Sequence, residues 1–480
     1  MSKRFYRKIS FGIGPHQTVP ADPLKWAQDQ VMAVPEITWP GAVPTGDEQL
    51  TRYAKFVYTD RKVLREEFRT DRKGYEAAKD KLRFAQGVKF YEGLELAIRH
   101  HTALNSPAPV FERLWLFWCN HFAITDKDFM PEFTTGPFHR ETIRTHMTGS
   151  FTELATAATL SWSMIHNLDN SDSVGPNSKN GQWRRKNKKP ATVNENHARE
   201  LLELHLLSPA AGYTQTDVIK LSYIMAGWEH KYSKKRLECN PVKFNQEKHE
   251  PGNHEVMGKR YKQRGLTPKN KLLDAIKDLS VHPACARFIS LKLCRHFVCD
   301  EPTPEMMAPI ITAFEETNGD LPSIHKALIA VVYAHAGTER KFQNPETWLL
   351  QMVNMSGAVW PPAADEMNYD FADYPNRRMR SPERYMTEIG HNPYRPEQPN
   401  GFPDTKSEWL SPELLIRRLT FARRFASRPY KPDNLDFDAM VEKNFDNVDE
   451  IKASVADIKT RRSEDVRMQI LFPSAWMLES

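Results

Sequence analysis

The segment Asn194–His205 reads NENHARELLELH and holds the densest group of residues able to do chemistry. Three carboxylates, one arginine and two histidines lie within it. Thr192 lies three residues before Glu195, and this capping-box spacing predicts that a helix begins here. At 3.6 residues per turn, one face of that helix carries Asn196, Arg199, Glu200 and Glu203. This polar face either meets solvent, with ion pairs four residues apart, or turns inward to hold a metal or a substrate.

Two kinds of chemistry fit the residues of this face. In the first, Glu200 or Glu203 acts as a general base while Arg199 holds an anionic group. In the second, ligands from facing helices bind iron, manganese or zinc, so the expected cofactor is a divalent metal. The predicted metal ligands are His121, Glu200, Glu203 and Asp217, with His205 or His249 as a further ligand. The sequence lacks the repeated Glu-x-x-His pair of di-iron bundles.

Neighbouring helices must position these side chains. Residues 111–122 are apolar on nearly all faces, which predicts a buried helix whose closing Asn120 and His121 need hydrogen-bond partners. Thr214 has the position of a helix cap, with Asp217 three residues further on. The connection between the two polar helices is short, so they form an αα-hairpin. This hairpin brings Asp217 toward the far end of the first helix.

The composition is that of a globular protein, since 40% of the 480 residues are hydrophobic and 27% are charged. No apolar run approaches the ~20 residues of a membrane-spanning helix, and residues 1–15 lack the apolar core of a signal peptide. We therefore expect a cytoplasmic protein with no membrane span. The five cysteines include no Cys-x-x-Cys pair, which predicts reduced thiols and excludes a zinc ribbon.

The net charge of +6 is partly concentrated in residues 183–190, WRRKNKKP. We expect this run to be a solvated loop, and no nucleic-acid motif accompanies it. Eleven tryptophans and the basic run raise the alternative of polysaccharide or nucleic-acid binding. Core packing accounts better for most of these tryptophans, so nucleic acid is not the partner that the sequence favours.

Helical periodicity dominates the chain and strand signals are few. This pattern predicts an all-α fold, a single large multi-helix domain with long ordered loops. A polar stretch from about 230 to 266 is expected to be one such loop. The expected organisation is an N-terminal extension over 1–45, a helical core domain over 46–335, a Pro-rich wrapping segment over 336–410 and C-terminal helices over 411–480. The sequence contains no nucleotide-binding loop, dinucleotide fingerprint or Gly-x-Ser-x-Gly elbow.

Four stretches occur in an order that closely resembles the bacterial domain-of-unknown-function 1800 family. They are residues 117–122 (FWCNHF), 194–205, 212–218 (GYTQTDV) and 282–293 (HPACARFISLKL). Residues 400–403 (NGFP) and 409–411 (WLS) resemble the C-terminal part of the family pattern, so the match extends over nearly the whole chain. The chain departs from the pattern at residues 161–164, where SWSM stands in place of His-Pro-Ala-Met.

The resemblance implies an all-helical fold and names no reaction. It also implies that Arg199, Glu200 and Glu203 turn inward to meet His121 and Asp217 in one buried network. The candidates for contact with a substrate or partner are Asn120, Asn194, Asn196, Tyr213, His249 and Lys292. Members of the family often look exported, so export is the alternative to a cytoplasmic location.

We therefore hypothesise that the chain is a binding or assembly protein built around this polar helix network. The resemblance implies a protein partner, a co-encoded sulfatase-like protein. One alternative is a metal-dependent or acid/base enzyme that uses His121, Glu200, Glu203 and Asp217. The other alternative is a polysaccharide-binding or nucleic-acid-binding protein.

Overall fold

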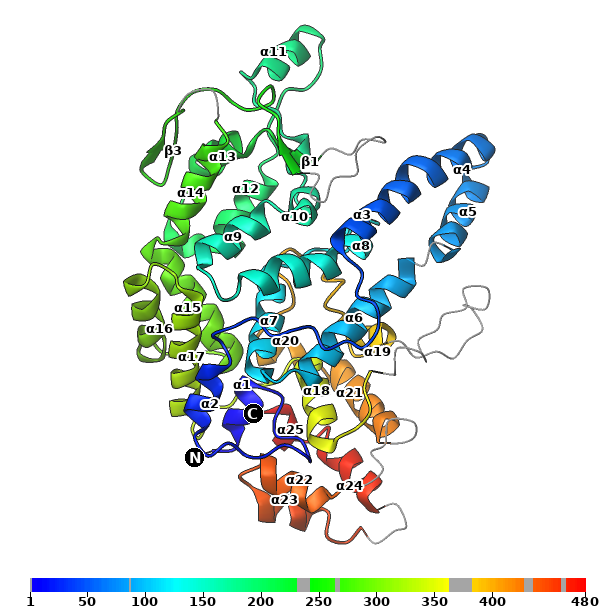
Figure 1. Cartoon of the computed structure of the whole chain (residues 1–480), viewed down its shortest axis with the longest axis vertical. Helices are drawn as coiled ribbons and strands as arrows, with labels where there is room; N and C mark the ends of the chain where they lie inside the picture. The colour runs from blue at the N-terminus through cyan, green and yellow to red at the C-terminus, as the bar shows by residue number, and fades with distance from the viewer. Residues whose placement is uncertain are drawn as a thin grey trace.

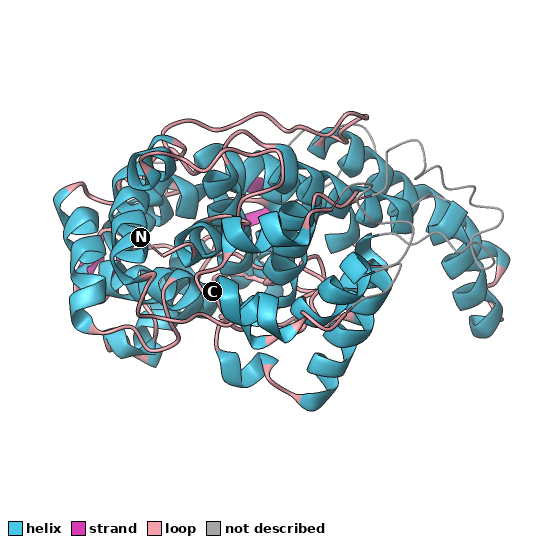
Figure 2. Ribbon diagram, turned by 90° about the horizontal axis from the view of Figure 1, so that it is seen from below, coloured by secondary structure: helices cyan, strands magenta, loops and turns pink. Residues whose placement is uncertain are grey.

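Helices make up nearly all of the regular structure in this computed structural model (Figures 1 and 2). The structure describes residues 2–85, 88–230, 242–263, 268–361, 382–426, 435–458 and 463–480. The predicted all-α fold is confirmed, and the strands of the described residues form only two short antiparallel pairs. Within these ranges, no helix is both long enough and apolar enough to cross a membrane. Parts of the predicted polar loop and of the Pro-rich segment lie outside the described residues, as does Cys239.

The first helix of the chain is part of the buried core. All six residues of α1 (Arg4–Ile9) are buried, and the helix contacts both α17 (Leu321–His335) and α22 (Phe437–Asn444). Further along the chain, α4 and α5 extend away from the body (Figure 1). The other helices of this part are α2 (Pro23–Asp29), α3 (Gly46–Lys55), α4 (Arg61–Glu67), α5 (Arg72–Ala85) and α6 (Val88–Asn105), with a π-helical turn at Phe56–Asp60. The predicted domain boundaries stay predictions.

Helix α7 (Pro109–His121) lies inside the larger hydrophobic core. Every residue from Val110 to Cys119 is buried, as the apolar sequence of this helix predicts. The same core includes residues of α9, α13 (Gln215–Met225), α15, α16 and α17. The bounds in this part are α8 (Pro131–Pro137), α9 (Phe151–Thr159), α10 (Trp162–Asn167), α11 (Lys179–Lys186), α14 (Asn270–Ser280), α15 (Pro283–Phe297) and α16 (Pro304–Glu316), with irregular helical turns at Phe138–Ile143, Arg144–His146 and Asn170–Asp172.

A second hydrophobic core lies around α18 (Pro345–Ser356), of which only Asn354 is not buried. Trp348 of this helix is fully buried and donates a hydrogen bond from Nε1 to the carbonyl of Phe472, 2.8 Å away. The C-terminal helices cover this core. They are α19 (Pro382–Glu388), α20 (Lys406–Trp409), α21 (Pro412–Phe425), α22, α23 (Val448–Ser454), α24 (Ser463–Leu471) and α25 (Ala475–Leu478).

The predicted αα-hairpin consists of α12 (Asn196–Glu200), continued by a π-helical turn over Leu201–Leu206, and α13 (Gln215–Met225). Thr214 and Asp217 form a reciprocal capping box at the start of α13, as predicted. The capping box predicted at Thr192 is wrong, because Asn194 supplies the side chain that accepts from the Asn196 N–H. A 3₁₀ turn at Pro209–Ala211 connects the two helices.

Two short hairpins follow α13 where one long polar loop was expected. Strand β1 (Trp228–His230) pairs with β2 (Val242–Phe244), with Glu229 opposite Lys243. Strand β3 (His254–Val256) pairs with β4 (Lys259–Tyr261). Helix α13 packs against β3, so this part of the chain is attached to the polar hairpin.

Lys8 of α1 is buried and donates a single hydrogen bond, to the Val298 carbonyl at 2.6 Å. Burial lowers its pKa from 10.5 to about 7. Between those values the unfolded chain binds more protons than the folded chain, so stability rises as the pH rises. We predict that the free energy of unfolding of the wild type, measured with urea, rises with pH over this range. In Lys8→Met this increase should be smaller by about 3–5 kcal/mol. Equal pH slopes for the two proteins would contradict this assignment.

Candidate functional site

The exposed side of α12 is occupied by polar contacts that hold the hairpin together. Arg199 Nη2 lies 3.2 Å from Glu195 Oε2 and 2.7 Å from Gln215 Oε1. Gln215 in turn donates to Glu195 Oε2 at 2.6 Å. Arg199 and Glu195 are each about one-third exposed, so this triangle joins α12 to α13 at the surface. It accounts for Arg199 without a bound anion.

The two glutamates that were predicted as acid or base are half-buried. Glu203 Oε2 accepts a hydrogen bond from the Tyr213 hydroxyl at 3.2 Å. Burial raises the pKa of Glu200, and the negative charge of Glu203 raises it further. The catalytic roles of Glu200, Glu203 and Arg199 stay predictions.

Asp217 does not join these glutamates. Its Oδ2 accepts from the Thr214 N–H and its Oδ1 accepts from the Met257 N–H, both at 2.7 Å. These bonds depress the pKa of Asp217 although burial acts in the opposite direction. The carboxylate therefore caps α13 and fixes the turn between β3 and β4.

His121 is buried, and its Nε2–H donates a hydrogen bond to the carbonyl of His205 at 3.1 Å. Burial lowers the pKa of His197 and of His205 to about 3, so both rings are neutral. Across the part of the chain that the structure describes, no three His, Cys, Asp or Glu side chains are placed to share a metal ion. The metal centre predicted at His121, Glu200, Glu203 and Asp217 stays a prediction, as does the network predicted to join them to Arg199.

Of the predicted substrate or partner contacts, Asn120 and His249 are hydrogen-bonded inside the protein, and Lys292 lies near an aromatic ring. The side chain of Asn120 makes two hydrogen bonds with the backbone of Phe402. Its Nδ2 donates to the Phe402 carbonyl, and its Oδ1 accepts from the Phe402 N–H, each at 2.8 Å. His249 Nδ1 lies 2.8 Å from the Ala226 carbonyl. Lys292 is half-buried 5.7 Å from the Phe288 ring, and burial lowers its pKa to about 8. Contact of Asn120, Asn194, Asn196, Tyr213, His249 and Lys292 with a substrate or partner stays a prediction.

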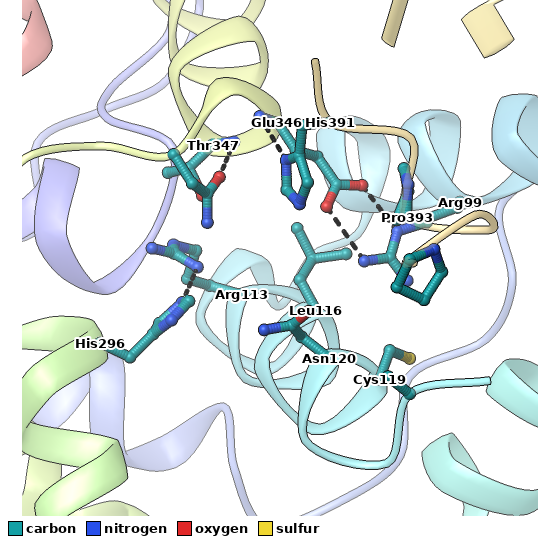
Figure 3. A pocket seen from close by; sticks show the side chains of 13 residues that line it. Arg99, Arg113, Leu116, Cys119, Asn120, His296, Glu346, Thr347, His391 and Pro393 are labelled. Atoms are coloured by element: carbon teal, nitrogen blue, oxygen red, sulfur yellow. Dashed lines mark hydrogen bonds and ion pairs between the residues drawn. The ribbon is translucent and has the colours of Figure 1, made fainter. Parts of the chain in front are cut away.

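The sequence missed a group of buried charges that lies between α7, α15 and α18 (Figure 3). These side chains line a cavity with space for about 20 Å³ of water. Arg99 of α6 donates to Glu346 of α18 through Nε at 2.7 Å and through Nη2 at 3.1 Å. Burial raises the pKa of Glu346, but the Arg99 guanidinium outweighs it and holds that pKa well below its usual range. Both groups are charged in the folded protein.

A second chain of polar groups meets the same cavity from α7. Arg113 donates from Nη1 to His296 Nε2 at 2.6 Å, and His296 Nδ1 lies 2.5 Å from Asp404 Oδ1. Burial lowers the pKa of His296 to about 4, so the ring is neutral. Its Nε2 accepts a hydrogen bond from Arg113, and its Nδ1–H donates one to the Asp404 carboxylate. The guanidinium of Arg113 also lies 5.0 Å from the Phe297 ring.

The sequence does contain one sign of these buried charges, namely polar residues within otherwise apolar helices. Glu112 and Arg113 interrupt the apolar run of α7, and each finds a buried partner from another element. Glu112 pairs with Arg144, where Nη2 lies 2.8 Å from Oε1. The sequence indicates that such partners must exist, but helical spacing does not identify them, because they come from distant segments.

Most of the tryptophans lie in the core, whereas Trp183 of the basic run is exposed. Seven of the eleven tryptophans are buried, as core packing predicts. Trp183 is 53% exposed, and Lys189 lies 5.0 Å from its ring. The basic run begins within α11, so the prediction of a loop is wrong for residues 183–186. The four described cysteines, Cys119, Cys285, Cys294 and Cys299, form no disulfide.

The fold and these buried networks define a large all-helical protein without a recognised reaction. A family model described as "Protein of unknown function (DUF1800)" matches residues 4–470. The chain belongs to this family. No curated protein and no solved structure matches it.

We predict that Glu346→Gln lowers the free energy of unfolding by about 3–5 kcal/mol, because it leaves the buried Arg99 charge without its partner. Urea unfolding at pH 7 measures this loss. The matched control is Glu413→Gln, which breaks an exposed ion pair with Arg417 in α21. That control should cost less than about 0.5 kcal/mol. Equal losses in the two variants would show that the Arg99–Glu346 pair contributes nothing beyond a surface ion pair.

Proposed function

We propose that this protein is a binding and assembly protein, and that an apolar groove of its C-terminal helices receives an amphipathic helix of a protein partner. The groove has a volume of about 470 Å³ and lies between α20, α21, α24 and α25. Its apolar lining is formed mainly by Leu410, Leu415, Ile416, Leu419, Ile470 and Leu478.

The exposure of this lining carries the proposal. Ile416 is 62% exposed, Leu410 is 44% exposed and Ile470 is 41% exposed, although their helices are otherwise packed on the core. Single exposed apolar side chains are ordinary on protein surfaces, but several that converge on one groove are typical of a binding surface. A partner that covers them would remove this apolar area from water.

The groove favours an acidic partner. Arg423 lies four residues after Leu419 and seven after Ile416, so it continues the groove face of α21. Arg423 is exposed, and no ion pair holds it among the described residues. Lys406 at the groove is 46% exposed, although Glu479 lies 2.5 Å from its Nζ. An acidic residue beside the apolar stripe of the partner helix would pair with Arg423.

An amphipathic helix fits this surface because its apolar residues recur every three or four positions and present one stripe. Leu415, Ile416 and Leu419 present the same spacing on α21, so two such stripes can pack together. The proposed partner is a separate protein, the co-encoded sulfatase-like protein that the family resemblance implies.

We predict that the tagged chain co-purifies with this sulfatase-like protein when the two are co-expressed. Ile416→Glu should lower the retained partner at least tenfold, because a carboxylate in the covered groove costs about 2 kcal/mol or more. The matched control is Val63→Glu on α4, since Val63 is 58% exposed and lies outside the groove. Retention in the control should equal that of the wild type.

Two results would count against this function. One is equal retention of the partner by wild type and Ile416→Glu. The other is a dimer of the chain alone, measured by light scattering, that Ile416→Glu dissociates, since the groove would then bind a second copy of this chain.

A further inference from the structure

We propose that the cavity between α7 and the start of α18 is a binding site for one small monovalent anion, of the class of chloride or a carboxylate group. Arg113 supplies the positive charge. It is 2% exposed, and Figure 3 shows its guanidinium extending from α7 toward the start of α18. The cavity is separate from the groove of the C-terminal helices, so the two proposals stand or fall independently.

The hydrogen bonds of the buried Arg113 guanidinium are incomplete. Its Nη1 donates to a neutral histidine, and its Nε has no hydrogen-bond partner. No carboxylate contacts it directly among the described residues: Glu346 pairs with Arg99, and the Asp404 carboxylate reaches Arg113 only through the neutral ring of His296. Contact with the Phe297 ring offsets part of the cost of burying this cation. It does not supply an acceptor for the remaining N–H groups of the guanidinium.

Further donors surround the same space. His391 Nδ1 accepts from the Glu346 N–H at 3.2 Å, so the ring proton of the neutral histidine is on Nε2. Asn344 Oδ1 accepts from the Thr347 N–H, which leaves the side-chain amide Nδ2 as a donor. The Thr347 hydroxyl is buried and has no partner, and all three residues line the cavity.

The acceptors that line the cavity are already used. Both oxygens of Glu346 accept from Arg99, and Oε1 also lies 3.3 Å from His100 Nε2. Asn120 Oδ1 accepts from the Phe402 N–H, and His296 Nε2 accepts from Arg113. Apart from the Thr347 hydroxyl, which can donate or accept, these side-chain acceptors already have donors, whereas an anion would complete the bonds of several donors.

The position of the cavity adds to this preference. It lies at the N-terminal end of α18, a helix of twelve residues, where the helix dipole favours negative charge. The backbone N–H groups of the first turn already bond to His391 and Asn344, so the side chains must make the direct contacts. The space of about 20 Å³ admits a single ion the size of a water molecule or slightly larger, which limits the ligand to one small anion.

The test measures the melting temperature of the full chain in sodium gluconate, whose anion is too large for the cavity. Sodium chloride or sodium formate then replaces gluconate at constant ionic strength. Both are expected to raise the melting temperature of the wild type, by an amount that increases with anion concentration as mass action requires. Arg113→Gln should abolish this rise, and Thr347→Val should weaken the apparent affinity several-fold.

Arg7→Gln is the control for loss of a buried arginine. Arg7 is also 2% exposed, but its guanidinium donates to the carbonyls of Trp476 and Glu479 and does not line the cavity. This variant should melt at a lower temperature than wild type and keep the full response to chloride and formate.

Bromide identifies the location and the kind of anion, even if Arg113→Gln fails to fold. A crystal of the wild type soaked in bromide should show an anomalous peak beside Arg113, Asn344 and His391. Formate that displaces this peak would show that a carboxylate uses the same site, and bromide that formate does not displace would restrict the site to halides. No peak, together with equal melting temperatures in gluconate, chloride and formate, would mean that the cavity holds only water and would overturn the proposal.

Discussion

The ion pair between Arg99 and Glu346 is the contact on which the arrangement of the two hydrophobic cores depends. Arg99 belongs to α6 and Glu346 to α18, and both side chains are almost completely buried. Burying either charge without the other would cost about 3–5 kcal/mol, so the helices that carry them are favoured in the register that pairs them. His100 and His139 contact the same pair, which extends this requirement to the segment after α8.

The same constraint recurs throughout the molecule. Arg144 pairs with Glu112, and Arg140 pairs with Glu95, in each case with both partners buried. Burying such pairs adds little net stability compared with apolar residues of the same volume. It does favour the arrangement in which these helices meet, because separating either pair would leave a buried charge without its partner. A large helical protein with many similar apolar stripes gains its unique packing in this way.

Several buried cations have no carboxylate partner within the residues that the structure describes. Lys8 donates to a backbone carbonyl, and Arg418 donates to the carbonyl of Gln343 and stacks near Phe342 and Trp348. Arg113 differs from these because it borders a cavity lined by further donors. The exposed apolar groove and the buried cavity thus present two different chemistries, one suited to a partner helix and one to a small anion.

The sequence by itself determined the all-helical class, the family, the buried course of α7 and the capping box at Thr214 and Asp217. These features depend on spacing within a few residues, and a helix or a cap is set by that spacing. Only the tertiary structure decided where the polar side chains point. Asp217 turns to Met257 and Asn120 turns to Phe402, because their partners come from segments that no local pattern relates. Arg99, Glu346 and His391 come together for the same reason, since a buried charge selects its partner in space and not along the chain.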